Sequence, residues 1–174
     1  MKKIMEMLQN MKAKNEKKDN KGFSLVELII VIAIMAILVG IVGTQVLPYI
    51  NKSKEAKDFQ IINSYGTAAT TAYSSNAEKV QTNITFKVYA PGSDATAVTL
   101  SKEIKDLTGY DTIDDLAGGE SASKTGKMAS KKGKTIAEIQ VSIDLTNKKI
   151  TTQAYSDANC SAGKEVFDAI VTEH

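Results

Sequence analysis

The chain has 174 residues, with 22 lysines, no arginine and 20 acidic residues, and its net charge at pH 7 is +2. A single cysteine, Cys160, excludes an intramolecular disulfide, and a single histidine, His174, excludes a site built on several histidines of one chain. The sequence lacks a phosphate-binding glycine loop, a zinc-protease motif, a CxxC pair and a nucleophile elbow. It therefore predicts a protein that is not an enzyme and that needs no cofactor or metal.

The first 22 residues, Met1 to Gly22, form a basic leader with seven lysines and three acidic residues. We interpret the leader as a flexible charged segment, with a short amphipathic helix at the inner leaflet as the alternative. Its lysine excess favours the cytoplasmic side of a membrane, which directs the rest of the chain outward. The basic surplus of the chain lies in this leader, so it gives no strong signal for nucleic-acid binding.

An apolar segment covers residues 23–48, and Glu27 is its only ionisable side chain. As a helix of roughly 35 Å it is long enough to cross the hydrocarbon core of a bilayer. A carboxylate near the bilayer centre costs about 2.5 kcal/mol or more, and less near the edge, so Glu27 needs a cationic partner. Cleavage between Gly22 and Phe23 would create an α-amino group about one helical turn away.

The string KGFSLVEL at positions 21–28, between a basic leader and an apolar run, resembles the class III signal of type IV pilins and pseudopilins. The resemblance implies cleavage after Gly22 by a prepilin peptidase, N-methylation of Phe23 and assembly of the apolar helices into a filament core. Glu27 would then be neutralised by the amine of a neighbouring subunit. The resemblance is specific over about the first third of the chain.

Pro48 lacks a backbone N–H and clashes with the preceding turn, so we expect a kink there or local unwinding between about Gly40 and Pro48. Residues 49–76 are predicted to continue as an amphipathic helix whose apolar stripe packs against a sheet. The stripe consists of Phe59, Ile62, Tyr65, Ala69, Ala72 and Tyr73. The expected solvent-facing residues are Lys52, Lys54, Glu55, Lys57 and Asp58.

Residues 77–174 are predicted to form an αβ connection and a small antiparallel sheet. Strands are expected at 84–90, at 136–145 with Glu138 on the polar face, and at 150–155, the last two forming a hairpin. Short helices are expected at 101–107, with Ser101 as N-cap, and at 111–116. The pattern at 163–174 fits a short helix or a closing strand equally. The predicted fold class is α+β, a long N-terminal helix packed on a small antiparallel sheet, as the resemblance to pilins also implies.

Three polar features suggest binding sites, and for each the plainer interpretation is favoured. Five lysines without an acid between Lys124 and Lys134 predict a solvated loop within 118–133, with contact to an anionic partner as the alternative. Carboxylates at Asp111, Asp114 and Asp115 are expected to cap or solvate, with calcium as the alternative. Cys160 is expected to be a small, partly buried residue, with an intersubunit bridge or a reactive thiol as the alternative.

We predict the structural subunit of an extracellular type IV pilus, held in the cell membrane by one span before assembly. Its expected partners are other copies in a helical homopolymer, prepilin peptidase, the pilus assembly platform and motor, and membrane lipid. Cell adhesion and motility are the expected roles of such a fimbrium. The alternatives are a pseudopilin or minor pilin of a secretion or DNA-uptake machine, or a singly anchored surface-binding protein that never polymerises.

Overall fold

The computed structural model describes residues 24–118 and 126–173. The chain divides into two units, Met1–Leu47 and Pro48–His174, and each is described by itself. The predicted leader and both sides of the predicted cleavage site, Gly22 and Phe23, lie outside the described residues.

The first unit is helical throughout its described part after Ser24. Helix α2 covers Leu25–Ile41 and continues into a π-helical turn, η1, at Val42–Val46. None of these residues is buried. In lipid a helix satisfies its backbone groups within itself, so an apolar run of this length is stable as a helix there.

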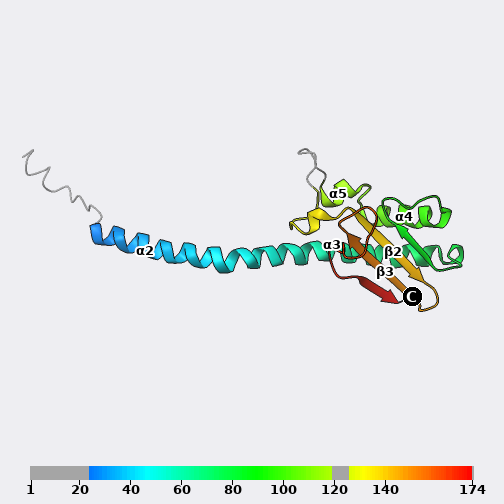
Figure 1. Cartoon of the computed structure of the whole chain (residues 1–174), viewed down its shortest axis with the longest axis horizontal. Helices are drawn as coiled ribbons and strands as arrows, with labels where there is room; N and C mark the ends of the chain where they lie inside the picture. The colour runs from blue at the N-terminus through cyan, green and yellow to red at the C-terminus, as the bar shows by residue number, and fades with distance from the viewer. Residues whose placement is uncertain (1–23, 119–125, 174) are drawn as a thin grey trace, which may run out of the picture. The chain divides into compact units, whose positions relative to one another are not determined.

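Helix α3 covers Leu47–Ser75, which confirms the prediction of a helix ending between residues 73 and 76 (Figure 1). The predicted stripe faces the core: Ile62, Tyr65, Ala69 and Ala72 are buried, and Phe59 and Tyr73 pack against them. One expectation is wrong, because Asp58 is buried instead of facing solvent. Its carboxylate is covered by a distant segment that supplies hydrogen-bond donors to it.

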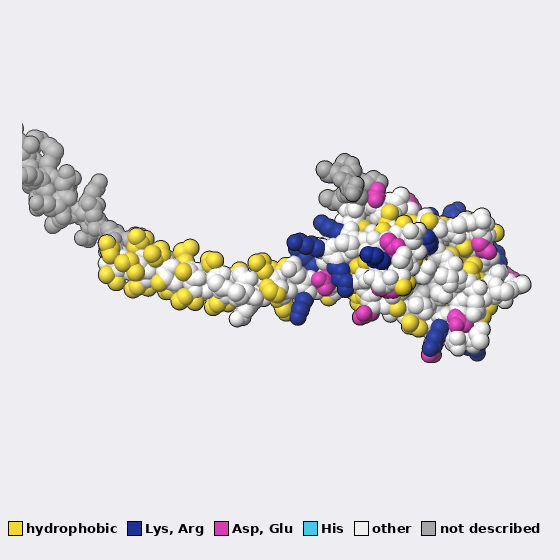
Figure 2. All heavy atoms as spheres, viewed as in Figure 1, with side chains coloured by type: hydrophobic (Ala, Val, Ile, Leu, Met, Phe, Trp, Pro, Cys, Tyr) yellow, Lys and Arg dark blue, Asp and Glu magenta, His cyan; other side chains and the backbone are white. Residues whose placement is uncertain are grey.

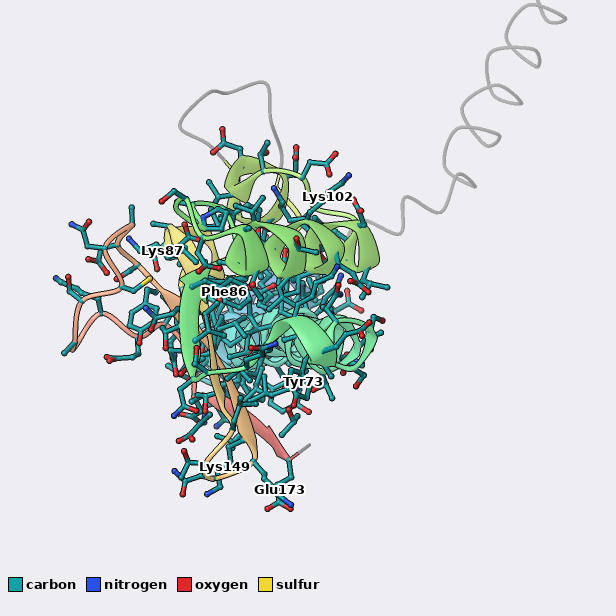
Figure 3. The ribbon with its side chains drawn as sticks, turned by 90° about the vertical axis from the view of Figure 1, so that its right-hand side faces the viewer. Tyr73, Phe86, Lys87, Lys102, Lys149 and Glu173 are labelled. Atoms are coloured by element: carbon teal, nitrogen blue, oxygen red, sulfur yellow. The ribbon has the colours of Figure 1, made fainter. Side chains whose placement is uncertain are left out.

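The second unit contains a four-stranded antiparallel sheet, which confirms the predicted α+β class. The strands are β1 (Ile84–Lys87), β2 (Glu138–Asp144), β3 (Lys149–Tyr155) and β4 (Ile170–Glu173), in the order β1-β2-β3-β4. The predicted hairpin pairs Ile143 with Ile150 across the turn at 146–148. The open question about the C-terminal segment is resolved, because β4 is a strand that closes the sheet. Figure 3 shows Lys149 and Glu173 at the same end of it, where the two residues are paired.

Helix α4 covers Ala95–Thr108 and therefore begins six residues before the predicted short helix. Its N-cap is Asp94, whose carboxylate accepts the Ala97 N–H at 2.8 Å. Ser101 is not the cap, and the prediction that it would be is wrong. It is buried inside the helix and donates its hydroxyl to the Val88 carbonyl at 2.7 Å, which ties α4 to the segment after β1.

Three short helical turns complete the second unit. Helix α5 covers Ile113–Ala117, close to the predicted turn at 111–116, and the 3-10 turns η2 and η3 cover Ala77–Lys79 and Gly133–Thr135. The loop predicted for 118–133 is described from residue 126 onward. That part is not a wholly exposed loop, because Met128, Ser130 and Gly133 are buried. They are buried because the segment folds back onto α3.

The strand pattern of β2 also departs from the prediction at its first residue. Glu138, expected on the polar face, is 2% exposed. Its Oε1 accepts the backbone N–H groups of Tyr89 at 2.9 Å and of Ile139 at 3.0 Å. Burial raises the pKa of this carboxyl, and the two backbone donors oppose that rise.

Candidate assembly helix and lysine surface

Helix α2 exposes apolar side chains on all its sides. Between Leu25 and Ile41 its large hydrophobic side chains are 47% to 73% exposed. A helix of a globular domain buries one apolar stripe, whereas a helix that is apolar all round requires lipid or other helices as its surroundings. The helical run Leu25–Ser75 contains the one segment, among the described residues, that is long and apolar enough to cross a membrane.

Glu27 lies in the first turn of α2, and its Oε2 accepts the Ser24 N–H at 2.9 Å. The first N–H groups of a helix have no intrahelical partner, and the helix dipole favours negative charge at this end. The carboxylate is therefore held at the N-terminal end of α2. Residues 24–47, the described part of this unit, contain no lysine, so they offer Glu27 no cationic side chain.

The turn η1 lies inside the segment where we expected local unwinding. The Thr44 hydroxyl donates to the Gly40 carbonyl at 3.0 Å, and the wider π-helical turn ends two residues before Pro48. Such turns arise where the regular ladder of helical hydrogen bonds is disturbed. The chain remains helical through Pro48, and a kink at that residue stays a prediction.

Asp58 joins α3 to the segment around residues 129–133, a contact that the sequence pattern did not predict. Its Oδ1 accepts the Ala129 N–H at 2.8 Å, and its Oδ2 accepts the Ser130 N–H at 2.7 Å and the Ser130 hydroxyl. The Ser130 oxygen in turn accepts the Gly133 N–H at 2.8 Å. A buried carboxylate is stable when its oxygens are fully bonded in this way.

We call this set of hydrogen bonds to Asp58 the clamp. It requires glycine at position 133, because a side chain there would not fit. A Cβ at position 133 would collide with the Asp58 carboxylate and would lie 3.1 Å from Cβ of Met128. The clamp therefore fixes the 126–135 segment against the fourth turn of α3. The sequence pattern did not predict this contact, since Asp58 and the donors that bond to it are about seventy residues apart.

The clamp brings two groups of lysines to the same side of the unit. Lys52 on α3 and Lys132 on the clamped segment both line an open cleft of about 280 Å³. Phe59 and Phe167 form its aromatic part, with ring centroids 6.0 Å apart, and Lys132 Nζ lies 5.0 Å from the Phe167 ring centroid. A cation over an aromatic face is attracted to it, which holds the Lys132 ammonium group beside the Phe167 ring.

A second polar cluster lies deeper in the unit. The hydroxyls of Tyr65 on α3 and Tyr89 after β1 are hydrogen-bonded at 2.5 Å, and the Tyr65 ring stacks on Tyr110. Burial raises the pKa of Tyr65 to about 12, and it also raises the pKa of Tyr89. Both phenols are therefore neutral at physiological pH, and the pair ties α3 to the segment after β1.

The remaining predicted polar residues are placed as follows. Asp115 Oδ2 accepts the Thr112 N–H at 3.0 Å and the Thr112 hydroxyl at 2.6 Å, so Asp115 caps α5 as expected. Within the described ranges, Asp111 and Asp114 do not join it in a group of three possible metal ligands. Cys160 is partly buried, as expected, and burial raises the pKa of its thiol.

The fold and the exposed helix define a class: an α+β protein with one N-terminal apolar helix suited to single-pass membrane anchoring. Residues 17–43 match the family model described as the prokaryotic N-terminal methylation motif. The chain thus carries the class III signal of type IV pilins and pseudopilins, which confirms the resemblance of the KGFSLVEL string. Neither a curated protein nor a solved structure matches the chain.

Proposed function

We propose that this chain is the structural subunit of an extracellular type IV pilus. It is stored in the membrane through residues 23–48, cut after Gly22 by a prepilin peptidase, N-methylated at Phe23 and polymerised through its N-terminal helix. The observation that carries the proposal is α2 itself: apolar side chains exposed on every side, with one carboxylate in its first turn. A helix of this kind is suited first to lipid and then to a bundle of identical helices.

The proposed mechanism uses the charge that cleavage creates. The new amine of Phe23 pairs with Glu27 of a neighbouring subunit, at the level where the Ser24 N–H already holds the carboxylate. Buried ion pairs add little net stability because desolvation offsets their attraction, but a buried charge without a partner is costly. The pair therefore acts chiefly on register, since helices out of step would leave Glu27 without a partner.

Close packing of the helices is supported by the glycines of the apolar segment. A Cβ at Gly40 or Gly43 would meet nothing within 4 Å, so neither glycine is required by the packing of its own described surroundings. Small residues let apolar helices approach closely within a membrane or a dry bundle. We assign these two positions to contacts between subunits.

The test is to shear filaments from cells that produce the chain, identify their main polypeptide and sequence its N-terminus. The proposal requires this chain in the filaments, beginning with N-methylated Phe23. Gly22→Val adds branched bulk at the cut site and is expected to leave uncut precursor in the membrane with no filaments. Normal processing of that variant, or a mature start other than Phe23, would contradict the assignment.

Two alternatives remain distinguishable by the same preparation. A pseudopilin or minor pilin of a secretion or DNA-uptake machine would carry the same processed N-terminus but would be scarce in sheared fibres. A singly anchored surface-binding protein would keep Met1 and would be absent from fibres. Under the proposed function, the expected partners include the pilus assembly platform and motor, and the expected roles are adhesion and motility.

A further inference from the structure

Charge is divided unevenly over the described residues of the second unit. Residues 48–58 and 126–135 carry seven lysines and two acidic residues, a net charge of +5. Residues 59–118 and 136–173 carry seven lysines and 13 acidic residues, a net charge of −6. Figure 2 shows the dark-blue side chains gathered around the first turns of α3 and the adjoining part of the second unit, which we call the head. The basic residues therefore form a patch, although the unit as a whole is close to neutral.

We call this patch the lysine surface. Its members, all exposed, are Lys52, Lys54, Lys57, Lys127, Lys131, Lys132 and Lys134. The hydrogen bonds from Ala129 and Ser130 to Asp58 join its two halves, and the cleft lined by both Lys52 and Lys132 shows that they meet. Asp58 is buried, and its negative charge is already counted in the net charge of +5.

The lysine surface begins where the apolar helix ends. Tyr49 and Ile50, at the start of α3, are 75% and 41% exposed, and Lys52 follows two residues later. At about 1.5 Å per residue, Lys57 lies about 10 Å beyond Ile50 along the helix. The headgroup region on each side of a bilayer is roughly 5–8 Å deep, and flexible lysine stems extend the reach of their ammonium groups. These lysines thus reach the depth of the lipid phosphates.

We propose that the lysine surface binds the phosphate groups of anionic lipids in the outer leaflet and holds the head against the membrane before assembly. The inference rests on the proposed function only for the insertion and orientation of the apolar helix. Lysines near the outer end of a span oppose the orientation that the leader favours, and phosphate binding offsets this. The contact is ionic and exposed, so salt weakens it, and extraction into a filament leaves the surface free.

Lipid fits this surface better than the acidic part of a second copy. The lysines continue directly from exposed apolar side chains on the same end of α3, which is the pattern of a membrane interface. The acidic residues are instead spread over the remainder of the unit. Glu55 and Asp168 also line the cleft, so we assign the phosphate contacts to the outward lysines and not to the floor of the cleft.

The test places the full-length chain in nanodiscs, either of phosphatidylcholine alone or of phosphatidylcholine mixed with phosphatidylglycerol. Brief acetylation followed by mass spectrometry then measures the reactivity of each lysine. We expect the lysine surface to react several-fold more slowly in the anionic discs, and to recover in about 1 M salt, where the Debye length falls to about 3 Å. Lys148, Lys149 and Lys164, which lie elsewhere on the unit, are internal controls that should not change.

A matched pair of variants completes the design. Lys131→Gln/Lys132→Gln/Lys134→Gln should restore the reactivity of Lys52 and Lys54 in anionic discs, while Lys148→Gln/Lys149→Gln should not. Equal protection in both kinds of disc would overturn the proposal, as would protection that appears only with two copies per disc, which indicates contact between chains. Neither readout involves filaments. Protection in a chain that never enters filaments would therefore leave the lipid contact standing and remove the pilus, and filaments without protection would do the reverse.

Discussion

Asp58 shows how a residue on a charged stretch of helix can become part of the core. The sequence around it, with Lys52, Lys54 and Lys57, has the composition of a solvated face. Its donors are 71 and 72 residues away, so no local pattern could identify it. A charged side chain on a helix is expected to be exposed only when no distant backbone N–H groups donate hydrogen bonds to it.

We predict that Asp58→Asn destabilises the protein by about 1.5–3 kcal/mol, the range for hydrogen bonds to a charged group. The amide can accept at one oxygen, but its NH2 group must then face the N–H or hydroxyl of Ser130, which donate in the native protein. Urea unfolding of the full chain in detergent would measure the loss. Asp106→Asn, at an exposed position of α4, is the matched control and should have little effect. Equal stability of both variants would contradict the clamp.

Glu138 leads to a prediction about pH. Its pKa is raised by burial, so on raising the pH from about 4.5 the unfolded chain ionises first and the folded protein loses stability in that window. Glu138→Gln keeps the Oε1 acceptor for Tyr89 and Ile139 but removes the charge. The variant should equal the native protein at low pH and should become the more stable of the two as the pH rises through the raised pKa of Glu138 in the folded state.

Unfolding curves at several pH values would measure this difference. The carboxyls of Asp144 and Asp157, whose pKa values are lowered mainly by hydrogen bonds from Asn147 and Ser161, titrate in the opposite sense. They are the same in both proteins, so their contribution cancels in the difference. A difference that does not change with pH would show that Glu138 is not desolvated.

Glu27 is the residue on which filament assembly is expected to depend. Glu27→Ala should be cleaved after Gly22 largely as the native precursor is, because the cut site is unchanged, yet it should yield few or no sheared filaments. Gel mobility of the membrane fraction reports cleavage, and the yield of filaments reports assembly. A normal filament yield from cleaved Glu27→Ala would remove the pairing mechanism.

At the scale of elements, the close approach of α3 to β4 depends on Gly66. A Cβ there would lie 2.6 Å from Cγ2 of Ile170, and such overpacking costs about 1–3 kcal/mol. Alanine is favoured over glycine within a helix by about 1 kcal/mol. We therefore predict that Gly66→Ala destabilises the native protein but stabilises the Ile170→Ala variant, in which Cγ2 is absent.

The four proteins of this cycle can be compared by thermal unfolding in detergent. The reversal of sign is the informative result, since a change of helix propensity alone would stabilise in both backgrounds. If Gly66→Ala had the same effect with and without Ile170→Ala, then α3 and β4 would not pack as described.

The elements predicted best are those whose pattern is local. The alternation at 136–145, the turn at 146–148 and the apolar stripe of α3 are each contained in a few consecutive turns or residues. The start of α4 was missed because residues 95–100 include threonine and valine, which are weak helix formers, although Asp94 offered a cap signal. The fate of the C-terminal segment required its partner β3, which sequence spacing alone does not supply.

At the scale of the whole molecule, the two parts of the chain, the apolar helix and the second unit, were predicted from very different sequence signals. The apolar helix and its motif lie in one continuous stretch, and that stretch could be interpreted without any tertiary contact. The burial of Asp58 and Glu138 and the joining of the lysine surface all depend on segments that meet only after folding. Sites of this second kind are where the sequence interpretation failed.

The described residues on the two sides of the 119–125 segment lie close together. Lys127 and Met128 donate their N–H groups to the carbonyls of Asp115 and Leu116 at 3.3 and 3.0 Å, and a Cβ at Gly126 would collide with the backbone of residues 117 and 118. The chain thus leaves and re-enters the second unit at two adjacent, hydrogen-bonded points. Because lengthening a loop between fixed ends costs little, foreign peptides could be grafted between these ends, and in the proposed filament they would be displayed in many copies.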